Sequence, residues 1–220
     1  MKLTANEYRT MVRSDFNAFI ERSFYELNPT TPFLPNWHIE VLAAELEACR
    51  RGETQRLIIT VPPRMLKSHC ASIAFPAWLL GHNPSAQIIV ASYAQELSNK
   101  LSSDSRTLIS APFYRDLFST RLSSQRQALQ EFATTKNGFR MATSVGGVLT
   151  GRGADFIIVD DPLKPDEALS GTQRKTVNEW FTHSLYSRLN DKRHGCIILI
   201  MQRLHEATLL VMFSAWNLGS

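Results

Sequence analysis

The sequence predicts an α/β fold in which a mostly parallel central sheet is covered by helices on both faces. Four short apolar runs, at residues 56–61, 87–92, 155–160 and 195–201, are rich in Ile, Val and Leu. Segments with helical spacing of apolar residues separate them. Such an alternation is typical of strands that are buried on both faces of a parallel sheet. Residues 138–144 predict a further, shorter strand between the second and the third run.

The helices are expected between and before these strands. Apolar positions at helical spacing predict one N-terminal helix over residues 7–27, followed by a Pro-rich connector at 28–35 that cannot be helical throughout. Further helices are expected at residues 37–51, 67–80, 94–109 and 170–189. We divide the chain into an N-terminal helix with its connector (1–36), a main domain (37–210) and a divergent tail (211–220).

The composition narrows the class of protein. The chain has 220 residues, 20% of them charged and 44% hydrophobic, which is ordinary for a soluble domain. No apolar run has the length of a membrane span, and the N-terminus does not read as a signal peptide, so we expect no membrane association. Three widely spaced cysteines exclude a disulfide framework and favour a reducing cytoplasm. The net charge of +4 is compatible with DNA as a partner but supports it only weakly.

Residues 62–68 have the setting of a phosphate-binding loop. A strand and a turn lead to Lys67 and Ser68 at a helix start, where backbone N–H groups attract an anion. In such a loop Lys67 reaches the β- and γ-phosphates of ATP and the Ser68 hydroxyl ligates Mg²⁺. However, Val61 and Leu66 occupy both glycine positions of the pattern G-x-x-x-x-G-K-[ST], and a side chain before the lysine can forbid the required backbone angles. An ordinary turn with an exposed Lys67 remains the alternative.

The third apolar run ends in two acids, Asp160 and Asp161. In open α/β sheets, ligands bind beyond the carboxyl ends of the strands. Asp160 can hold Mg²⁺ there, while Asp161 can orient or deprotonate the attacking water, although most such ATPases use Glu at the second position. The alternative is that both acids cap a turn. A Lys-Ser loop combined with a later acid-terminated strand is much more specific than either feature alone.

With these residues assembled, the chain resembles the large-subunit terminase family of tailed phages and prophages. One branch of that family has Leu before the lysine, which makes Leu66 less exceptional. The resemblance implies a P-loop NTPase of the ASCE type, with three α/β/α layers and a terminase ATPase domain over residues 37–210. It covers about residues 33–209 and rests on the segments 61–68, 74–82, 143–153, 160–164 and 201–206.

The resemblance also implies roles for individual residues. Arg64 would sense or stabilise the γ-phosphate, Arg152 would serve as an arginine finger for a neighbouring subunit, and Gln202 would couple phosphate loss to movement. Which arginine acts as the finger is open, and Arg152 and Gln202 have plainer alternatives as a loop cation and a sheet cap. Trp37 lies with His38 where the family contacts adenine, although a tryptophan there is more often a core residue. The residues expected to bind ATP are Pro63, Arg64, Met65, Leu66, Lys67 and Ser68.

The function implied by the resemblance is an ATP-hydrolysing, Mg²⁺-dependent motor that drives double-stranded DNA into a procapsid. Its expected partners are the DNA, a portal protein, a small terminase subunit and further copies of the chain in a ring, in the cytoplasm of a bacterial host. Family members carry a nuclease domain after the motor, and we expect none in this chain.

Two alternatives remain. The first is a truncated prophage remnant that folds and binds nucleotide without catalysis or packaging. Its motivation is the divergent tail, where Ala207 and Thr208 replace a usual acidic pair. The second is an ATPase of related design, such as a helicase, against which the Pro-Pro-Arg loop and the Thr-Gly-Arg-Gly segment argue.

Overall fold

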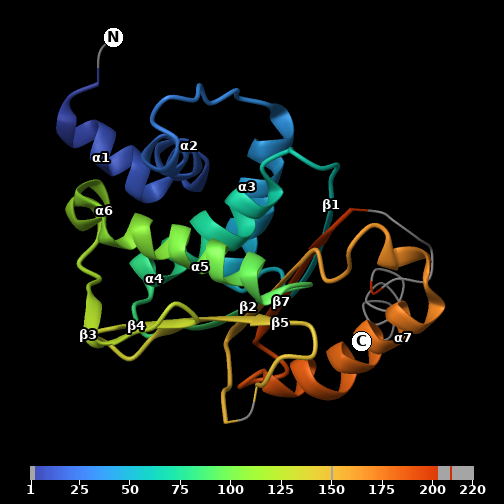
Figure 1. Cartoon of the computed structure of the whole chain (residues 1–220). Coiled ribbons are helices and arrows are strands. Elements are labelled where there is room, and N and C mark those ends of the chain that lie inside the picture. Colours follow the sequence, from blue (N-terminus) through green and yellow to red (C-terminus); the bar gives the residue numbers. More distant parts are fainter. Residues whose placement is uncertain (1–2, 150, 203–208, 210–220) are drawn as a thin grey trace.

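The computed structural model describes residues 3–149, 151–202 and 209. Within this part of the chain, seven strands form one sheet in the order β1-β7-β6-β2-β5-β4-β3 (Figure 1). The first five strands in that order are parallel, and β4 and β3 continue the sheet antiparallel. Their bounds are β1 (Arg56–Thr60), β7 (Cys196–Met201), β6 (Phe156–Asp160), β2 (Gln87–Ser92), β5 (Phe139–Ser144), β4 (Glu131–Thr134) and β3 (Leu122–Gln127).

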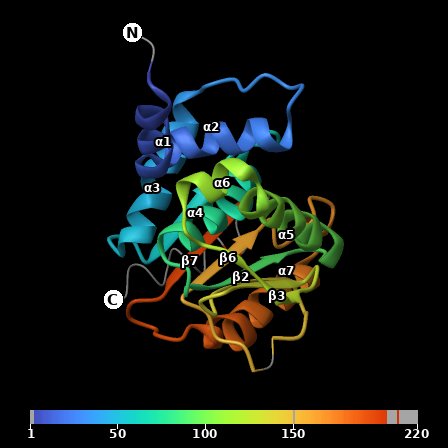
Figure 2. The same cartoon turned by 90° about the vertical axis from the view of Figure 1, so that its left-hand side faces the viewer.

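Helices cover both faces of the sheet, which confirms the predicted three-layer α/β/α class. Figures 1 and 2 show α3 (Trp37–Arg51), α4 (Phe75–His82) and α5 (Gln95–Ser110) on one face and α7 (Gly171–Trp180) on the other. A further group, α1 (Ala5–Ser14), α2 (Phe16–Leu27) and α6 (Pro112–Leu117), lies outside the first three. The shorter helices are η1 (His69–Ala74), η2 (Glu167–Leu169), η3 (Phe181–Leu185) and η4 (Tyr186–Arg188).

The core has two halves, one on each face of the sheet. Because successive strand residues point to opposite faces, Ile158 and Ile198 pack with the helices of the α3–α5 side, while Ile157 and Ile197 pack with the α7 side. All four side chains are fully buried. In the described part of the chain, none of the helices combines the length and the apolarity that crossing a membrane requires.

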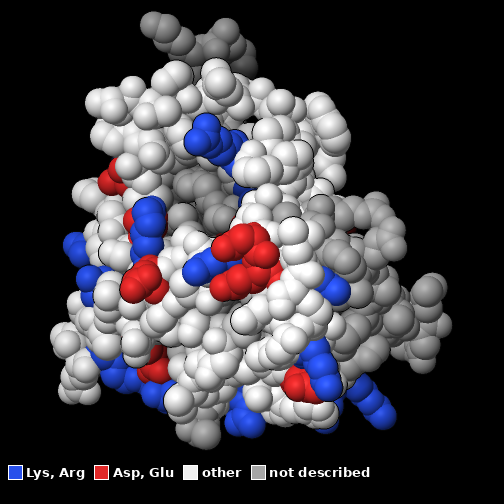
Figure 3. Space-filling view, turned by 45° about the vertical axis from the view of Figure 1, so that its right-hand side comes forward, with Lys and Arg blue, Asp and Glu red and all other residues white. Residues whose placement is uncertain are grey.

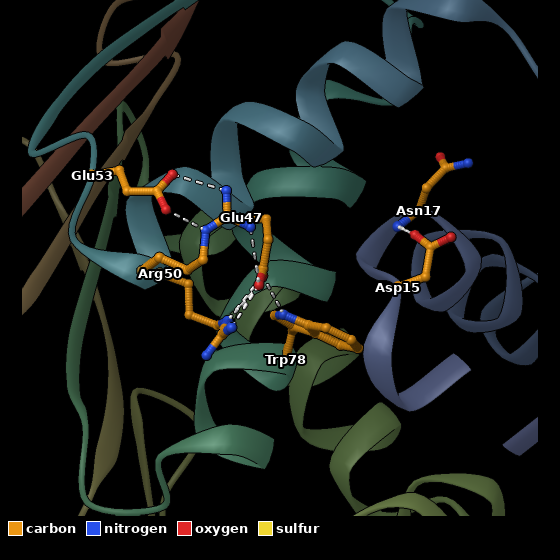
Figure 4. Close-up of polar contacts among 7 residues, drawn as sticks. Asp15, Asn17, Glu47, Arg50, Glu53 and Trp78 are labelled. Carbon is orange, nitrogen blue, oxygen red and sulfur yellow. Dashed lines mark hydrogen bonds and ion pairs between the residues drawn. The ribbon is translucent and has the colours of Figure 1, made fainter. Parts of the chain in front are cut away.

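The predicted strands match the observed ones closely, but the N-terminal helix prediction is wrong in one respect. The segment 7–27 is not one helix, because Asp15 ends α1 and begins α2. The Asp15 carboxylate accepts a hydrogen bond from the Asn17 backbone N–H at 2.8 Å, and this cap stabilises a new helix start (Figure 4). The strands β3 and β4 and the helix α6 were not predicted, because their sequences are polar or short.

Two other predicted helices also differ from the structure. The segment 67–80 contains the π-helix η1 before α4. Pro76 lies in the first turn of α4 and has no N–H to donate to the Ser72 carbonyl in an α-helical pattern. The segment 170–189 divides into α7, η3 and η4.

A polar network ties α3 to α4. The Glu47 carboxylate accepts hydrogen bonds from Arg50, the shortest at 2.6 Å, and from the Trp78 indole N–H at 2.9 Å (Figure 4). Burial alone would raise the pKa of Glu47, but the hydrogen bonds from Arg50 and Trp78 outweigh it and lower the pKa below its ordinary value. The ionised carboxylate therefore stabilises the folded state.

We predict that Glu47→Gln lowers the free energy of unfolding at pH 7 by about 1–2 kcal/mol, as loss of a charge-assisted hydrogen bond should. Because the folded-state pKa of Glu47 lies below the unfolded one, its contribution is present above the unfolded pKa and is lost as the pH falls through the folded pKa. The difference from wild type, measured by urea unfolding, should therefore shrink in acid. Glu53→Gln, which removes an exposed partner of Arg51, is the control and should have a smaller effect. If the stability difference between Glu47→Gln and wild type did not depend on pH, the lowered pKa of Glu47 would be contradicted.

Candidate active site

The loop between β1 and the following helix holds two non-glycine residues in the left-handed region. Arg64 has φ of 64° and Leu66 has φ of 57°. Such a conformation costs about 1–2 kcal/mol per residue. Leu66 thus adopts the backbone angle for which glycine is preferred, and its side chain packs against the core of the α3–α5 side. The loop is held further by His38, whose Nε2 lies 3.2 Å from the Met65 carbonyl oxygen and donates to it.

Lys67 is buried beside an acid at the carboxyl edge of the sheet. Its Nζ lies 2.9 Å from Asp161 Oδ1 and 2.8 Å from Oδ2, and its side chain is only 6% exposed. The alternative of an exposed lysine at an ordinary helix start is therefore wrong. The structure joins the Lys-Ser loop to the acid-terminated strand directly.

Besides Lys67, three hydrogen bonds from two neighbouring segments fix Asp161. Its backbone N–H donates to the Ile200 carbonyl at 2.8 Å, and its own carbonyl accepts from the Tyr93 N–H at 3.1 Å. The Gln202 backbone N–H donates to Asp161 Oδ1 at 3.3 Å. Asp161 itself has φ of 42°, so its left-handed conformation ends the strand. Gln202, predicted as a coupling residue, thus contacts the second acid.

Asp160 lies in a different environment from its neighbour. It is 1% exposed, and its Oδ2 accepts a hydrogen bond from the Ser72 hydroxyl at 2.7 Å. Burial raises the pKa of Asp160 to about 6, and the Asp161 charge adds to the rise, while Ser72, Ser68 and Lys67 oppose it. The alternative in which both acids merely cap a turn does not fit a carboxylate that faces the helix of the phosphate loop.

The oxygen atoms at this edge fit a bound Mg²⁺. Asp160 Oδ1 is buried and has no hydrogen-bond partner in the described part of the chain, and the Ser68 side chain is close enough to affect the pKa of Asp160. Mg²⁺ prefers oxygen ligands and usually takes only one or two carboxylates plus phosphate oxygens. Among the described residues, no group of three or more His, Cys, Asp or Glu side chains could hold a metal ion.

Arg152 is not part of the Lys67–Asp161 cluster. Its guanidinium pairs with Glu131 on β4 at 3.0 Å, and Arg126 on β3 pairs with the same carboxylate. Phe139 on β5 lies 5.8 Å below the Arg152 guanidinium. Arg152 therefore has a defined intramolecular partner on β4.

The remaining predicted residues lie around the loop. Arg64 and Pro63 are exposed, and Met65 and Ser68 are partly buried. Trp37 is 73% exposed, so the alternative of a core tryptophan is wrong, whereas its neighbour His38 is buried. The segment 203–206 of the expected coupling motif lies outside the described residues.

Sequence reasoning missed Ser72, Arg140 and Glu131. Arg140 lies in β5 with 0% exposure, and it contacts the Ser72 carbonyl. An arginine inside the predicted strand 138–144 was a visible signal, because an unpaired charge is rarely buried. Ser72 and Glu131 gave no such signal.

The surface charge adds little to the DNA prediction. On the face drawn in Figure 3, Lys and Arg side chains are scattered among acidic and uncharged areas instead of forming one broad basic patch.

Two solved structures share this fold. The large terminase of bacteriophage HK97 has a TM-score of 0.57 and 15% identity, and the match covers 94% of this chain and 41% of that one. The DEAD-box helicase Dbp5 of S. cerevisiae, in a structure with Nup159, Gle1 and ADP, has a TM-score of 0.50 and 11% identity, covering 91% of this chain and 49% of its own. This chain thus spans less than half the length of either protein.

At the level of sequence, no family model matches and no curated protein matches. Both structural neighbours have P-loop NTPase folds. The Lys67 loop and the acidic end of β6 also occupy the carboxyl edge of a parallel sheet, where α/β proteins bind ligands. The chain therefore has a P-loop NTPase fold that resembles the fold of a phage large terminase.

Proposed function

We propose that this chain is the ATP-hydrolysing motor domain of a phage-type terminase. The observation that carries the proposal is the meeting of Lys67 with Asp161, beside the buried Asp160, at the carboxyl edge of a terminase-like sheet. ATP would bind along the loop 63–68, with backbone N–H groups and Lys67 facing its phosphates.

The geometry supports an exchange of partners during the reaction. When phosphates arrive, Lys67 moves from Asp161 to the β- and γ-phosphate oxygens, and the Asp161 carboxylate becomes free to orient the attacking water. Ser68 and Asp160 would hold Mg²⁺, which when bound neutralises charge on the phosphates. Arg64, which is exposed on the loop, would stabilise the γ-phosphate.

At the level of the assembled machine, we propose that hydrolysis drives double-stranded DNA into a procapsid. The partners would be a portal protein, a small terminase subunit and further copies of this chain in a ring, in the cytoplasm of a bacterial host. These finer assignments rest on the motif resemblance and on the likeness of fold to the HK97 large terminase.

Lys67→Ala should abolish DNA-stimulated ATP turnover, because Lys67 is the buried cation that we propose faces the phosphates. Phosphate release is the measurement, and circular dichroism checks the fold. Lys175→Ala, at an exposed lysine on α7, is the matched control and should retain turnover. A folded wild-type protein that shows no turnover with DNA and the other packaging components would refute the motor proposal. Unwinding of a duplex would favour a helicase instead.

Substitutions at Arg64 should separate backbone strain from chemistry. Arg64→Gly should be more stable than Arg64→Ala by about 1 kcal/mol, because only glycine adopts a positive φ without cost. Both variants lack the guanidinium and should lose ATP turnover equally. Thermal unfolding and phosphate release test the two points. Equal stability of the variants would show that the loop does not keep this conformation in solution.

The ion pair with Glu131 gives Arg152 an intramolecular partner while it is not acting as an arginine finger. Glu131 holds two guanidiniums with one carboxylate, so Arg126 remains as its partner if Arg152 leaves. The Arg152 side chain is 43% exposed, and an ion pair at this exposure is worth little. Arg152 can therefore transfer to the phosphates in a neighbouring copy at low cost.

Mixing two inactive variants should test this transfer. Lys67→Ala supplies Arg152 but cannot bind ATP productively, while Arg152→Ala binds ATP but supplies no finger. The mixture should therefore turn over ATP faster than the sum of its parts. Adding Glu131→Gln to the Lys67→Ala chain should raise the recovered rate by roughly two- to five-fold, since it removes a weak competing ion pair. Absence of recovery would exclude Arg152 as a finger acting between copies.

A further inference from the structure

Arg140 is a charged side chain in the interior of the protein. It lies on β5 with 0% exposure, and its Nη2 donates to the Ser72 carbonyl at 3.1 Å. Its Nε and Nη1 have no hydrogen-bond partner among the described residues. Burying a charge without a direct carboxylate partner is costly, so an apolar side chain would serve packing better.

The Ser72 carbonyl has a specific need for this donor. In an α-helix it would accept from residue 76, but Pro76 has no N–H. The backbone forms the π-helix η1 here, and π segments are frequent at functional sites. Arg140 supplies the Ser72 carbonyl with a donor where Pro76 offers none.

Ser72 also faces the acidic end of β6. Its hydroxyl donates to Asp160 Oδ2 at 2.7 Å, and both residues are buried. Ser72 thus accepts a hydrogen bond from Arg140 through its backbone carbonyl and donates one to Asp160 through its hydroxyl. This contact occupies Oδ2 and leaves Asp160 Oδ1 without a protein partner.

We propose that Arg140 is a positioning residue for Asp160 that acts through Ser72. By fixing the Ser72 carbonyl, Arg140 orients the hydroxyl that holds Asp160 Oδ2, so that Oδ1 is presented to Mg²⁺. This inference rests on the proposed Mg²⁺-ATP site.

Arg140 keeps its charge although it is buried. Burial lowers the pKa of Arg140 to about 9, although the nearby Asp104 and Asp160 charges raise it. Arg140 therefore stays protonated at neutral pH.

The test is a double-mutant cycle on Arg140→Met and Ser72→Ala. Its readout is the Mg²⁺ concentration that gives half of the ADP-induced rise in melting temperature. Each single variant should raise this concentration about 10-fold, as loss of support for a metal ligand does. The double variant should show little further change, and ADP binding in EDTA should match wild type. Arg140→Lys, which keeps a charged donor, should recover part of the loss.

Ser98→Ala provides the matched control. Ser98 is also fully buried and its hydroxyl donates to a backbone carbonyl, that of Val90, without touching Asp160. It should lower the melting temperature without changing the Mg²⁺ midpoint. If Arg140→Met does not fold, the cycle is run with Arg140→Lys, for which a smaller shift that again disappears with Ser72→Ala is expected.

Two results would overturn the positioning role alone. They are an unchanged Mg²⁺ midpoint in the Arg140 variant, and an Arg140 effect of the same size with and without the Ser72 hydroxyl. Failure of wild-type protein to bind Mg²⁺-ADP would instead overturn the proposed function, and this inference with it.

Discussion

The ion pair between Lys67 and Asp161 is the constraint on which the site depends. Lys67 follows β1 and Asp161 follows β6, and β7 lies between these strands in the sheet. The pair therefore spans the end of the middle strand, where Gln202 donates its N–H to the same carboxylate. Three strands must end at matching levels for this to occur. Fully buried apolar residues in a continuous parallel register provide that alignment.

Asp160 and Asp161 have different surroundings because the backbone turns at Asp161. Asp160 is the last residue of β6 and points into the interface with η1, where Ser72 holds it. Asp161 takes a left-handed φ, which ends the strand, and its carboxylate reaches Lys67. Burial makes ionisation of Asp160 costly and raises its pKa, so a bound cation that compensates this charge would gain binding energy there. The position at which β6 ends therefore determines the different environments of Asp160 and Asp161.

Much of this arrangement could be predicted from the sequence, because it follows from apolar runs and their order. Those runs located the parallel strands, and the rule for carboxyl ends brought Lys67 near Asp160 and Asp161. The conformation of Leu66 could not be read from residue type, since propensity argues against it and only tertiary packing offsets the strain. Contacts between distant segments, such as Ser72 with Asp160, have no local signal. The break at Asp15 had one, because aspartate is a strong helix N-cap.

If the proposed nucleotide site is correct, the shared carboxylate links nucleotide binding to β7. Asp161 Oδ1 receives both Lys67 Nζ at 2.9 Å and the Gln202 N–H at 3.3 Å. If phosphates drew Lys67 away, the carboxylate would lose its cation and would interact mainly with the N–H of Gln202. A hydrogen bond to an ionised group strengthens when no cation competes for the same oxygen. Occupancy of the phosphate loop would therefore alter the end of β7 through a single shared atom, without a relay across the core.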